Sequence, residues 1–95
     1  MKQPAVYLVA NKRNDTLHIG MASNLVRRIW EHREGMVDGF TKRYGCKNLV
    51  WFEAQSTMLE AIAREKQIKG GSRATKIRLI KALNPEWQDL NPAIV

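Results

Sequence analysis

Side chains suited to phosphate chemistry lie within the first 32 residues of this 95-residue chain. Tyr7 and His18 stand on either side of a polar stretch. Arg28 follows Gly20 by eight residues, and His32 follows Arg28 by four. Phenol and imidazole groups can orient or deprotonate water, and a guanidinium group can neutralise a phosphate. These residue types at this spacing make phosphodiester hydrolysis a candidate activity.

A carboxylate further along the chain is the candidate metal ligand. Glu65 completes the apolar stripe of an expected helix, where a carboxylate is costly unless it is paired or binds a cation. Arg64 and Lys66 flank it, so the alternative is an edge residue with a local ion pair. The other members of the stripe are Met58, Ala61, Ile62 and Ile68.

The elements that would position these side chains begin with short strands. Residues 6–9 are apolar and mostly β-branched or aromatic, and residues 17–19 follow the polar stretch 11–15, so we expect a hairpin. A third strand is expected over residues 48–53. Three strands with helices covering them favour a small two-layer α+β domain.

Capping residues place the first expected helix and the loop that follows it. Ser23 or Asn24 can cap a helix that runs to about Glu34 and ends at Gly35. We expect residues 35–45 to form a long loop, because glycines punctuate this stretch.

Two more helices are expected in the C-terminal half. Thr57 and Glu60 form a capping box for a helix that stops at Gly70-Gly71. Ser72 caps another helix that runs to about Leu83, where an Asn-Pro pair ends it.

Apolar side chains at helical spacing define the faces that we expect to be buried. Arg28 and His32 lie one turn apart on a flank of the first stripe, and an ordinary polar flank is the alternative explanation for both. Trp30, Trp51 and Phe52 are expected in or near the core rather than as base-stacking platforms. The stripes are Leu25, Val26, Ile29 and Trp30 in the first helix and Ile77, Leu79, Ile80 and Leu83 in the last.

Composition favours a single basic domain over residues 1–95, with its core at about 4–90. The formal net charge of +7 favours a polyanionic partner, nucleic acid before membrane. A ribosome-associated or merely basic protein is the alternative. No apolar run is long enough to span a bilayer, the N-terminus does not resemble a signal peptide, and Cys46 is the single cysteine. We therefore expect a cytoplasmic protein without a disulfide partner, as a monomer or weak dimer.

Basic residues are the candidates for contacts to a nucleic-acid backbone. They gather between residues 64 and 81, with a smaller group in the expected loop. Such a run can follow a phosphate backbone, although a solvated face is the ordinary explanation. The candidates are Lys42, Arg43, Lys69, Arg73 and Lys76.

Taken together, the segments resemble the GIY-YIG nuclease domain over nearly the whole chain, and in particular its small stand-alone bacterial members. Ala5-Val6-Tyr7 is similar to the end of the first signature, and His18-Ile19-Gly20 to the second, with His18 in place of its first tyrosine. Arg28 matches the family arginine, and residues 63–69 match the helix that carries the metal-binding glutamate. Residues 37–44 and 84–87 are similar to stretches of the stand-alone members.

This resemblance implies a three-stranded antiparallel sheet flanked by helices and metal-dependent hydrolysis of DNA, with low or structure-based specificity. Glu65 would hold Mg²⁺ or Mn²⁺, and Arg28 would contact the scissile phosphate. Tyr7 would orient water, His18 would activate it, and His32 would assist as an acid or orienting group. We expect these five side chains to converge on one concave face, each beside a stripe facing the same sheet. The alternatives are a non-catalytic nucleic-acid-binding module weakened by His18, and a protein–protein adaptor.

Overall fold

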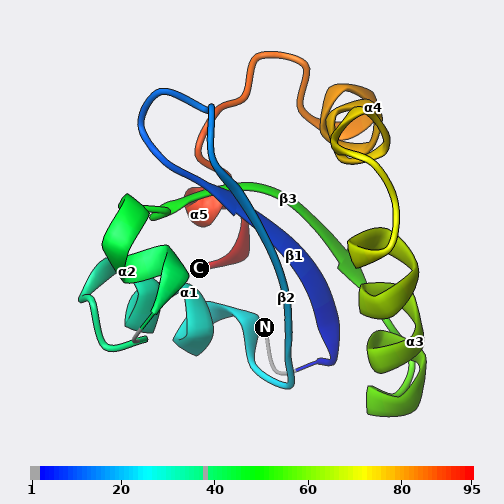
Figure 1. Cartoon of the computed structure of the whole chain (residues 1–95). Helices are drawn as coiled ribbons and strands as arrows, with labels where there is room; N and C mark the ends of the chain where they lie inside the picture. The colour runs from blue at the N-terminus through cyan, green and yellow to red at the C-terminus, as the bar shows by residue number, and fades with distance from the viewer. Residues whose placement is uncertain (1–2, 38) are drawn as a thin grey trace.

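Three strands form one antiparallel sheet in the computed structural model, which describes residues 3–37 and 39–95. The strands are β1 (Ala5–Ala10), β2 (Leu17–Ala22) and β3 (Asn48–Ala54), in the order β2-β1-β3. All six residues of the central strand β1 are buried, and β2 forms one open edge of the sheet (Figure 1). The expected hairpin, third strand and α+β class are confirmed.

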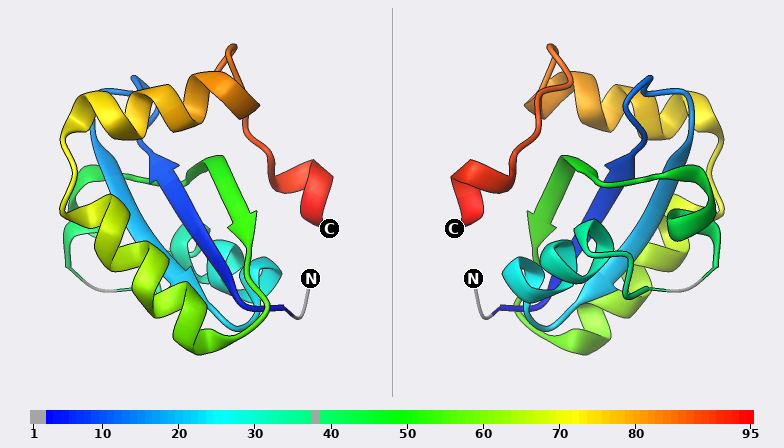
Figure 2. Two further views of the ribbon diagram at one scale, coloured as in Figure 1. Left: turned by 90° about the vertical axis from the view of Figure 1, so that its right-hand side faces the viewer. Right: turned by 90° about the vertical axis from the view of Figure 1, so that its left-hand side faces the viewer.

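Helices cover both faces of this sheet (Figure 2). Helices α3 (Met58–Lys69) and α4 (Arg73–Leu83) lie on one face, and α1 (Leu25–Arg33) and α5 (Asn91–Ile94) lie on the other. The expectation of two layers is therefore corrected to helix, sheet and helix. The reason is that alternate residues of β1 point to opposite faces, and both sets are apolar.

The two hydrophobic clusters follow this alternation along β1. Val6 and Leu8 pack with Ile68 and Ile80 from α3 and α4. Tyr7 and Val9 lie in the second cluster, whose buried helical members come from α1 and against which α5 also packs. Because neighbouring residues of β1 face opposite clusters, the position of Tyr7 in the strand decides which helix it meets.

Side-chain caps begin three of the helices as expected. The Asn24 side chain accepts a hydrogen bond from the Arg27 backbone N–H, Thr57 accepts one from Glu60, and Ser72 accepts one from Thr75. Gly35, with φ of +69°, follows the end of α1 in the left-handed conformation. The helix boundaries are therefore largely local properties of the sequence.

The loop expected over residues 35–45 is partly wrong, because α2 (Phe40–Tyr44) lies within it; Asp38 in this stretch is outside the described residues. This five-residue helix has no side-chain cap. Its Thr41 is buried and its hydroxyl contacts His32, so tertiary contacts hold α2 where local signals are weak.

Three side chains expected in buried stripes are exposed: Trp30 at 52%, Leu83 at 52% and Met58 at 36%. Helix α1 instead turns Leu25, Ile29 and His32 toward the sheet. Trp30 then lies about 100° away around the helix. His32 is therefore in the core-facing stripe and not on its flank.

The C-terminal tail is tied to β3 and α1. Leu90 donates a backbone hydrogen bond of 2.7 Å to Leu49, and Arg33 forms an ion pair with Asp89. None of the helices in the described part of the chain is both long and apolar enough to cross a membrane.

Candidate active site

Tyr7 reaches the open edge of the sheet because its neighbour on β2 has no side chain. Tyr7 is paired with Gly20 in the β1–β2 register. A Cβ atom at Gly20 would lie 2.5 Å from the Tyr7 hydroxyl oxygen, well inside van der Waals contact. Gly20 is therefore required by space, and its absent side chain leaves room for the phenol ring.

A buried chain of hydrogen bonds holds the Tyr7 hydroxyl. It lies 2.9 Å from Nε2 of His32, and Nδ1 of His32 lies 3.1 Å from the hydroxyl of Thr41. All three residues are less than 5% exposed. A neutral imidazole satisfies both contacts with one ring nitrogen donating and the other accepting.

Burial keeps both members of the Tyr7–His32 pair neutral at physiological pH. Desolvation raises the pKa of Tyr7 to about 12, against a smaller lowering by Arg28. Desolvation also lowers the pKa of His32 to about 4, with His18 and Arg28 acting in the same direction. This pair is therefore suited to fixing a hydroxyl group in place.

His18 lies beside this pair on β2 and is only half-buried. Its ring centroid is 6.1 Å from that of His32 and 6.1 Å from that of Phe40. Burial lowers the pKa of His18, the positive charge of Lys69 lowers it further, and Glu65 opposes them. A neutral and partly accessible imidazole at pH 7 can accept a proton.

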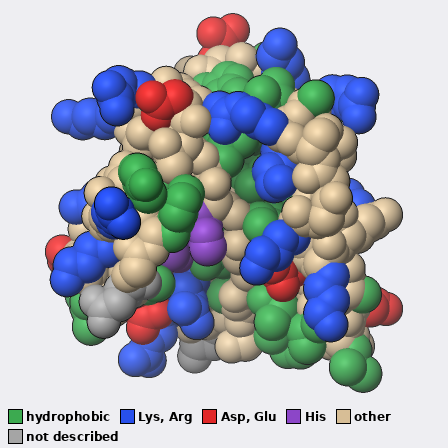
Figure 3. Space-filling view, in the orientation of Figure 1, with side chains coloured by type: hydrophobic (Ala, Val, Ile, Leu, Met, Phe, Trp, Pro, Cys, Tyr) green, Lys and Arg blue, Asp and Glu red, His purple; other side chains and the backbone are tan. Residues whose placement is uncertain are grey.

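Glu65 approaches the same place from α3, on the opposite face of the sheet. Helix α3 packs closely on β2, and the Glu65 carboxylate acts electrostatically on both Tyr7 and His18. Its role in metal binding stays a prediction. The expectation that all five side chains converge on one concave face is wrong for Glu65, because α3 covers the opposite face of the sheet from α1. Glu65 and His18 are nevertheless within electrostatic reach of each other across β2. Histidine side chains lie there between the two helical layers, with basic groups on both sides (Figure 3).

The alternative explanation of Glu65 as half of a local ion pair does not hold. Arg64 turns to Glu53 instead, with Nε 2.8 Å from the carboxylate oxygen. Within residues 3–37 and 39–95, no hydrogen bond or ion pair involves Glu65, which is half-buried. A half-buried carboxylate without a cationic partner is suited to a cation.

Arg28 is held at the rim of the same edge. Arg28 is half-exposed, and its Nε atom lies 3.7 Å from the Glu31 carboxylate. The Nε atom of the preceding residue, Arg27, lies 3.5 Å from the same carboxylate. The Arg28 charge lowers the pKa of both Tyr7 and His32, so it lies within electrostatic reach of them. Arg27 is far more exposed, at 75% of its side chain against 42%.

The donor set for a metal ion is small. Among the described residues there is no group of three or more His, Cys, Asp or Glu side chains placed to hold one. Glu65 therefore does not belong to a closed protein cage. One unpaired carboxylate fits Mg²⁺, which keeps several water ligands and is bound in many sites by one or two carboxylates and substrate phosphates.

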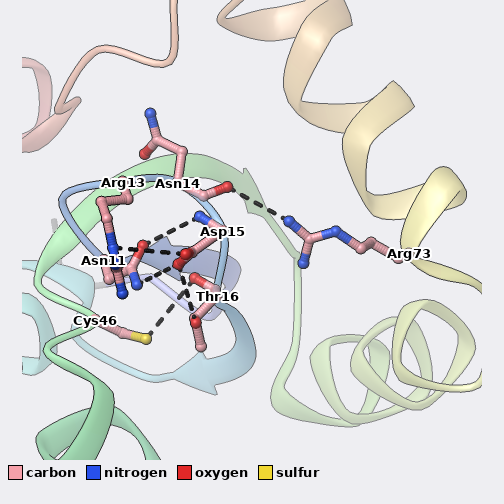
Figure 4. Close-up of polar contacts among 7 residues, drawn as sticks. All are labelled: Asn11, Arg13, Asn14, Asp15, Thr16, Cys46 and Arg73. Carbon is pink, nitrogen blue, oxygen red and sulfur yellow. Dashed lines mark hydrogen bonds and ion pairs between the residues drawn. The ribbon is translucent and has the colours of Figure 1, made fainter.

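The basic residues proposed for nucleic-acid contacts lie at different places around this edge. Lys69 acts on His18, Lys42 is exposed on α2, and the Arg43 guanidinium lies 5.6 Å from the centre of the Tyr44 ring. Two others are used within the fold. Arg73 donates to the backbone carbonyl of Asn14 (Figure 4), and Lys76 to that of Gly71.

Sequence analysis missed three side chains beside the site. Thr41 was hidden because α2 was not expected. Phe40 and Tyr44 are aromatic residues, 48% and 46% exposed, in the same short helix. The i, i+4 spacing of these two rings was the available signal.

Comparison with known proteins shows which family has this arrangement of residues. Residues 3–78 match the family model described as the GIY-YIG catalytic domain. The chain belongs to the GIY-YIG family. In this GIY-YIG domain, Tyr7 of the first signature and Gly20 of the second are cross-strand neighbours on β1 and β2.

Relatives of this GIY-YIG domain include small bacterial proteins. The chain is 35% identical over 80 residues to a UPF0213 protein of Staphylococcus saprophyticus, covering 84% of this chain and 96% of that protein. It is 39% identical over 72 residues to a UPF0213 protein of Syntrophus aciditrophicus, covering 75% and 82%. The solution structure of a UPF0213 protein from Bacillus halodurans is similar, with a TM-score of 0.58, 25% identity and 92% coverage of both chains. The predicted resemblance to small bacterial GIY-YIG proteins is confirmed.

Proposed function

We propose that this GIY-YIG domain is a metal-dependent endonuclease that hydrolyses DNA phosphodiester bonds at the open edge of β2, with low or structure-based specificity. The observation that carries the proposal is that His18, a neutral and partly accessible imidazole on β2, lies within electrostatic reach of Glu65, an unpaired carboxylate on α3, which packs on the same strand. One group can take a proton and the other can hold a cation.

The roles of the side chains follow from their accessibility and charge. His18 accepts the proton of the attacking water at a ring nitrogen. Tyr7 orients this water. His32 holds the Tyr7 hydroxyl in place through a buried hydrogen bond, and Thr41 in turn holds the His32 ring. Arg28 contacts the scissile phosphate, where its charge stabilises the additional negative charge of the transition state.

Glu65 would hold the cation, Mg²⁺ or Mn²⁺. When bound, such a cation polarises a phosphoryl oxygen and stabilises the leaving oxyanion. Lys69, Arg43 and Lys42 would contact the backbone phosphates on either side of the scissile bond.

The test compares nicking of supercoiled plasmid by the wild-type protein, Glu65→Gln and Glu86→Gln across a Mg²⁺ titration. Glu86 is an exposed carboxylate in the C-terminal segment and serves as the matched control. We expect Glu65→Gln to lose Mg²⁺-dependent nicking while DNA binding is retained or slightly tighter, because a negative charge near the phosphate is removed. Glu86→Gln should nick as the wild type does.

Two outcomes would overturn the proposal. Wild-type nicking by purified Glu65→Gln would show that the activity comes from elsewhere. DNA binding by the wild-type protein without nicking at any Mg²⁺ or Mn²⁺ concentration would instead favour the binding module.

A further inference from the structure

A cavity lies at the turn end of the β1–β2 hairpin. Its volume is about 560 Å³, within the range of small-molecule sites. It is open to solvent and is lined by the hairpin loop, the C-terminal ends of α1 and α2, and the start of β3. The charged and aromatic residues that line it, called here the basic pocket, are Lys12, Arg13, Arg33, Tyr44 and Lys47.

The charge of the basic pocket favours an anion. None of the described residues that line the cavity is acidic. Lys12 and Lys47 form no ion pair with any described residue. The Nε atom of Arg33 is buried and has no hydrogen-bond partner among the described residues. Arg13 has only an exposed pair with Asp15, at 3.5 Å, which solvent screens.

The hairpin loop that carries Lys12 and Arg13 is held by its own polar contacts (Figure 4). The Asn11 side chain donates to the Asp15 carboxylate and accepts from the Asp15 backbone N–H. Arg73 from α4 donates to the Asn14 carbonyl, and Asn14 is in the left-handed conformation with φ of +58°. The backbone at the rim of the basic pocket is thereby fixed before any ligand binds.

An aromatic path joins the basic pocket to the β2 edge. Tyr44 lines the cavity, and its ring centroid is 4.7 Å from that of Phe40. Phe40 in turn stacks on His18 at 6.1 Å. Exposed aromatic rings beside basic side chains are the combination that binds nucleotides by stacking and by charge.

We propose that the basic pocket binds one nucleotide of the substrate strand, away from the scissile phosphate. Its base stacks on Tyr44, and its phosphate is held by Lys12 and Lys47. A base stacked within a duplex cannot also stack on a protein ring, so the nucleotide at this position is unpaired. The chemistry recognised is that of a phosphorylated nucleotide, and its assignment to the cleaved strand rests on the proposed function.

The first experiment uses NMR of the ¹⁵N-labelled chain, without divalent metal, titrated with thymidine 5′-monophosphate and with inorganic phosphate. We expect the amide signals of Lys12, Gly45 and Lys47 to shift with both ligands. Affinity should be higher for the nucleotide, and Tyr44→Ala should remove this advantage while Tyr44→Phe keeps it, because a phenyl ring still stacks.

The second experiment measures binding of a short fluorescent oligothymidylate in EDTA at several salt concentrations. Tyr44→Ala should weaken binding by about tenfold, the order found when one stacking ring is removed. Lys12→Ala combined with Lys47→Ala should weaken binding and lower the salt slope by roughly 0.7 for each lost phosphate contact. Lys81→Ala, an exposed lysine on α4, is the matched control.

The outcomes separate this proposal from the proposed function, because binding in EDTA requires no cleavage. Wild-type oligonucleotide affinity in the pocket variants would overturn the nucleotide subsite even if the wild-type protein nicks DNA. Mononucleotide shifts in the pocket together with unchanged oligonucleotide affinity would also overturn it, since the ligand would then be a free nucleotide. Loss of affinity in the variants would support it even if no nicking is found.

Discussion

The Tyr7 hydroxyl and Nε2 of His32 lie 2.9 Å apart, although 25 residues separate them in the chain. One comes from the central strand and the other from the core-facing side of α1. Because both groups are buried, neither can exchange this contact for water without cost. The contact fixes a phenol group at the sheet edge and determines how the domain responds to acid.

We expect acid to destabilise the domain through His32. Its pKa is about 4 in the folded chain against 6.5 for the free group, so between these values the unfolded chain binds a proton that the folded chain does not. The stabilisation is present above pH 6.5 and is lost as the pH falls toward 4. The free energy of unfolding should decrease by about 3 kcal/mol over this range. Urea unfolding of the wild type and of His32→Gln at pH 6.5 and at pH 4 measures this change in the free energy of unfolding. An equally steep pH dependence in His32→Gln would contradict the assignment.

Gly20→Ala should destabilise the domain by about 1–3 kcal/mol, the usual cost of overpacking. The new Cβ atom would lie 2.5 Å from the Tyr7 hydroxyl. The cost should nearly vanish in a Tyr7→Ala background, where the ring is gone. A double-mutant cycle from denaturant unfolding checks this, and additive effects would rule out steric conflict as the cause.

Arg28→Ala should lower the nicking rate by about 10²–10³-fold, the order found when one transition-state contact is removed. Arg27→Ala is the matched control, since both arginines are next to Glu31 but Arg27 is far more exposed. The measurement is the single-turnover rate at saturating DNA and Mg²⁺. Equal losses in the two variants would indicate a general charge effect and not a phosphate contact.

If His18 is the base, activity should fall on acidification with an apparent pKa below 6.5, because burial and Lys69 lower the pKa of this imidazole. The active form is the neutral one, so the activity is present above this pKa and lost below it. His18→Phe should lose most of the nicking activity without unfolding, and His18→Tyr should retain part of that activity. A wild-type profile in His18→Phe would leave His18 as a packing residue.

Lys69→Met provides a finer test of the same group. Removing the positive charge should raise the pKa of His18 and move the acid limb of the pH–rate profile to higher pH. Lys66→Met, an exposed lysine one turn earlier, should leave the limb in place. A shift of the same size in both variants would show that His18 does not set the limb.

Local sequence signals determined the strands, the hairpin and the beginnings of three helices. The caps at Asn24, Thr57 and Ser72 act within three or four residues, so they can be read without knowing the fold. The ordered signatures around Tyr7 and Gly20 likewise predicted the family, since their spacing is set by a hairpin.

Tertiary structure alone decided which faces the helices cover and what meets at the edge of β2. Helical periodicity assigned Trp30 to the core, but burial depends on the direction in which α1 docks, and that direction exposed Trp30 and buried His32. Glu65 acts electrostatically on His18 because α3 packs on β2, the strand that carries His18. The basic pocket joins segments from the hairpin, two helices and β3. Such relationships arise from packing between distant segments, on which no local pattern reports.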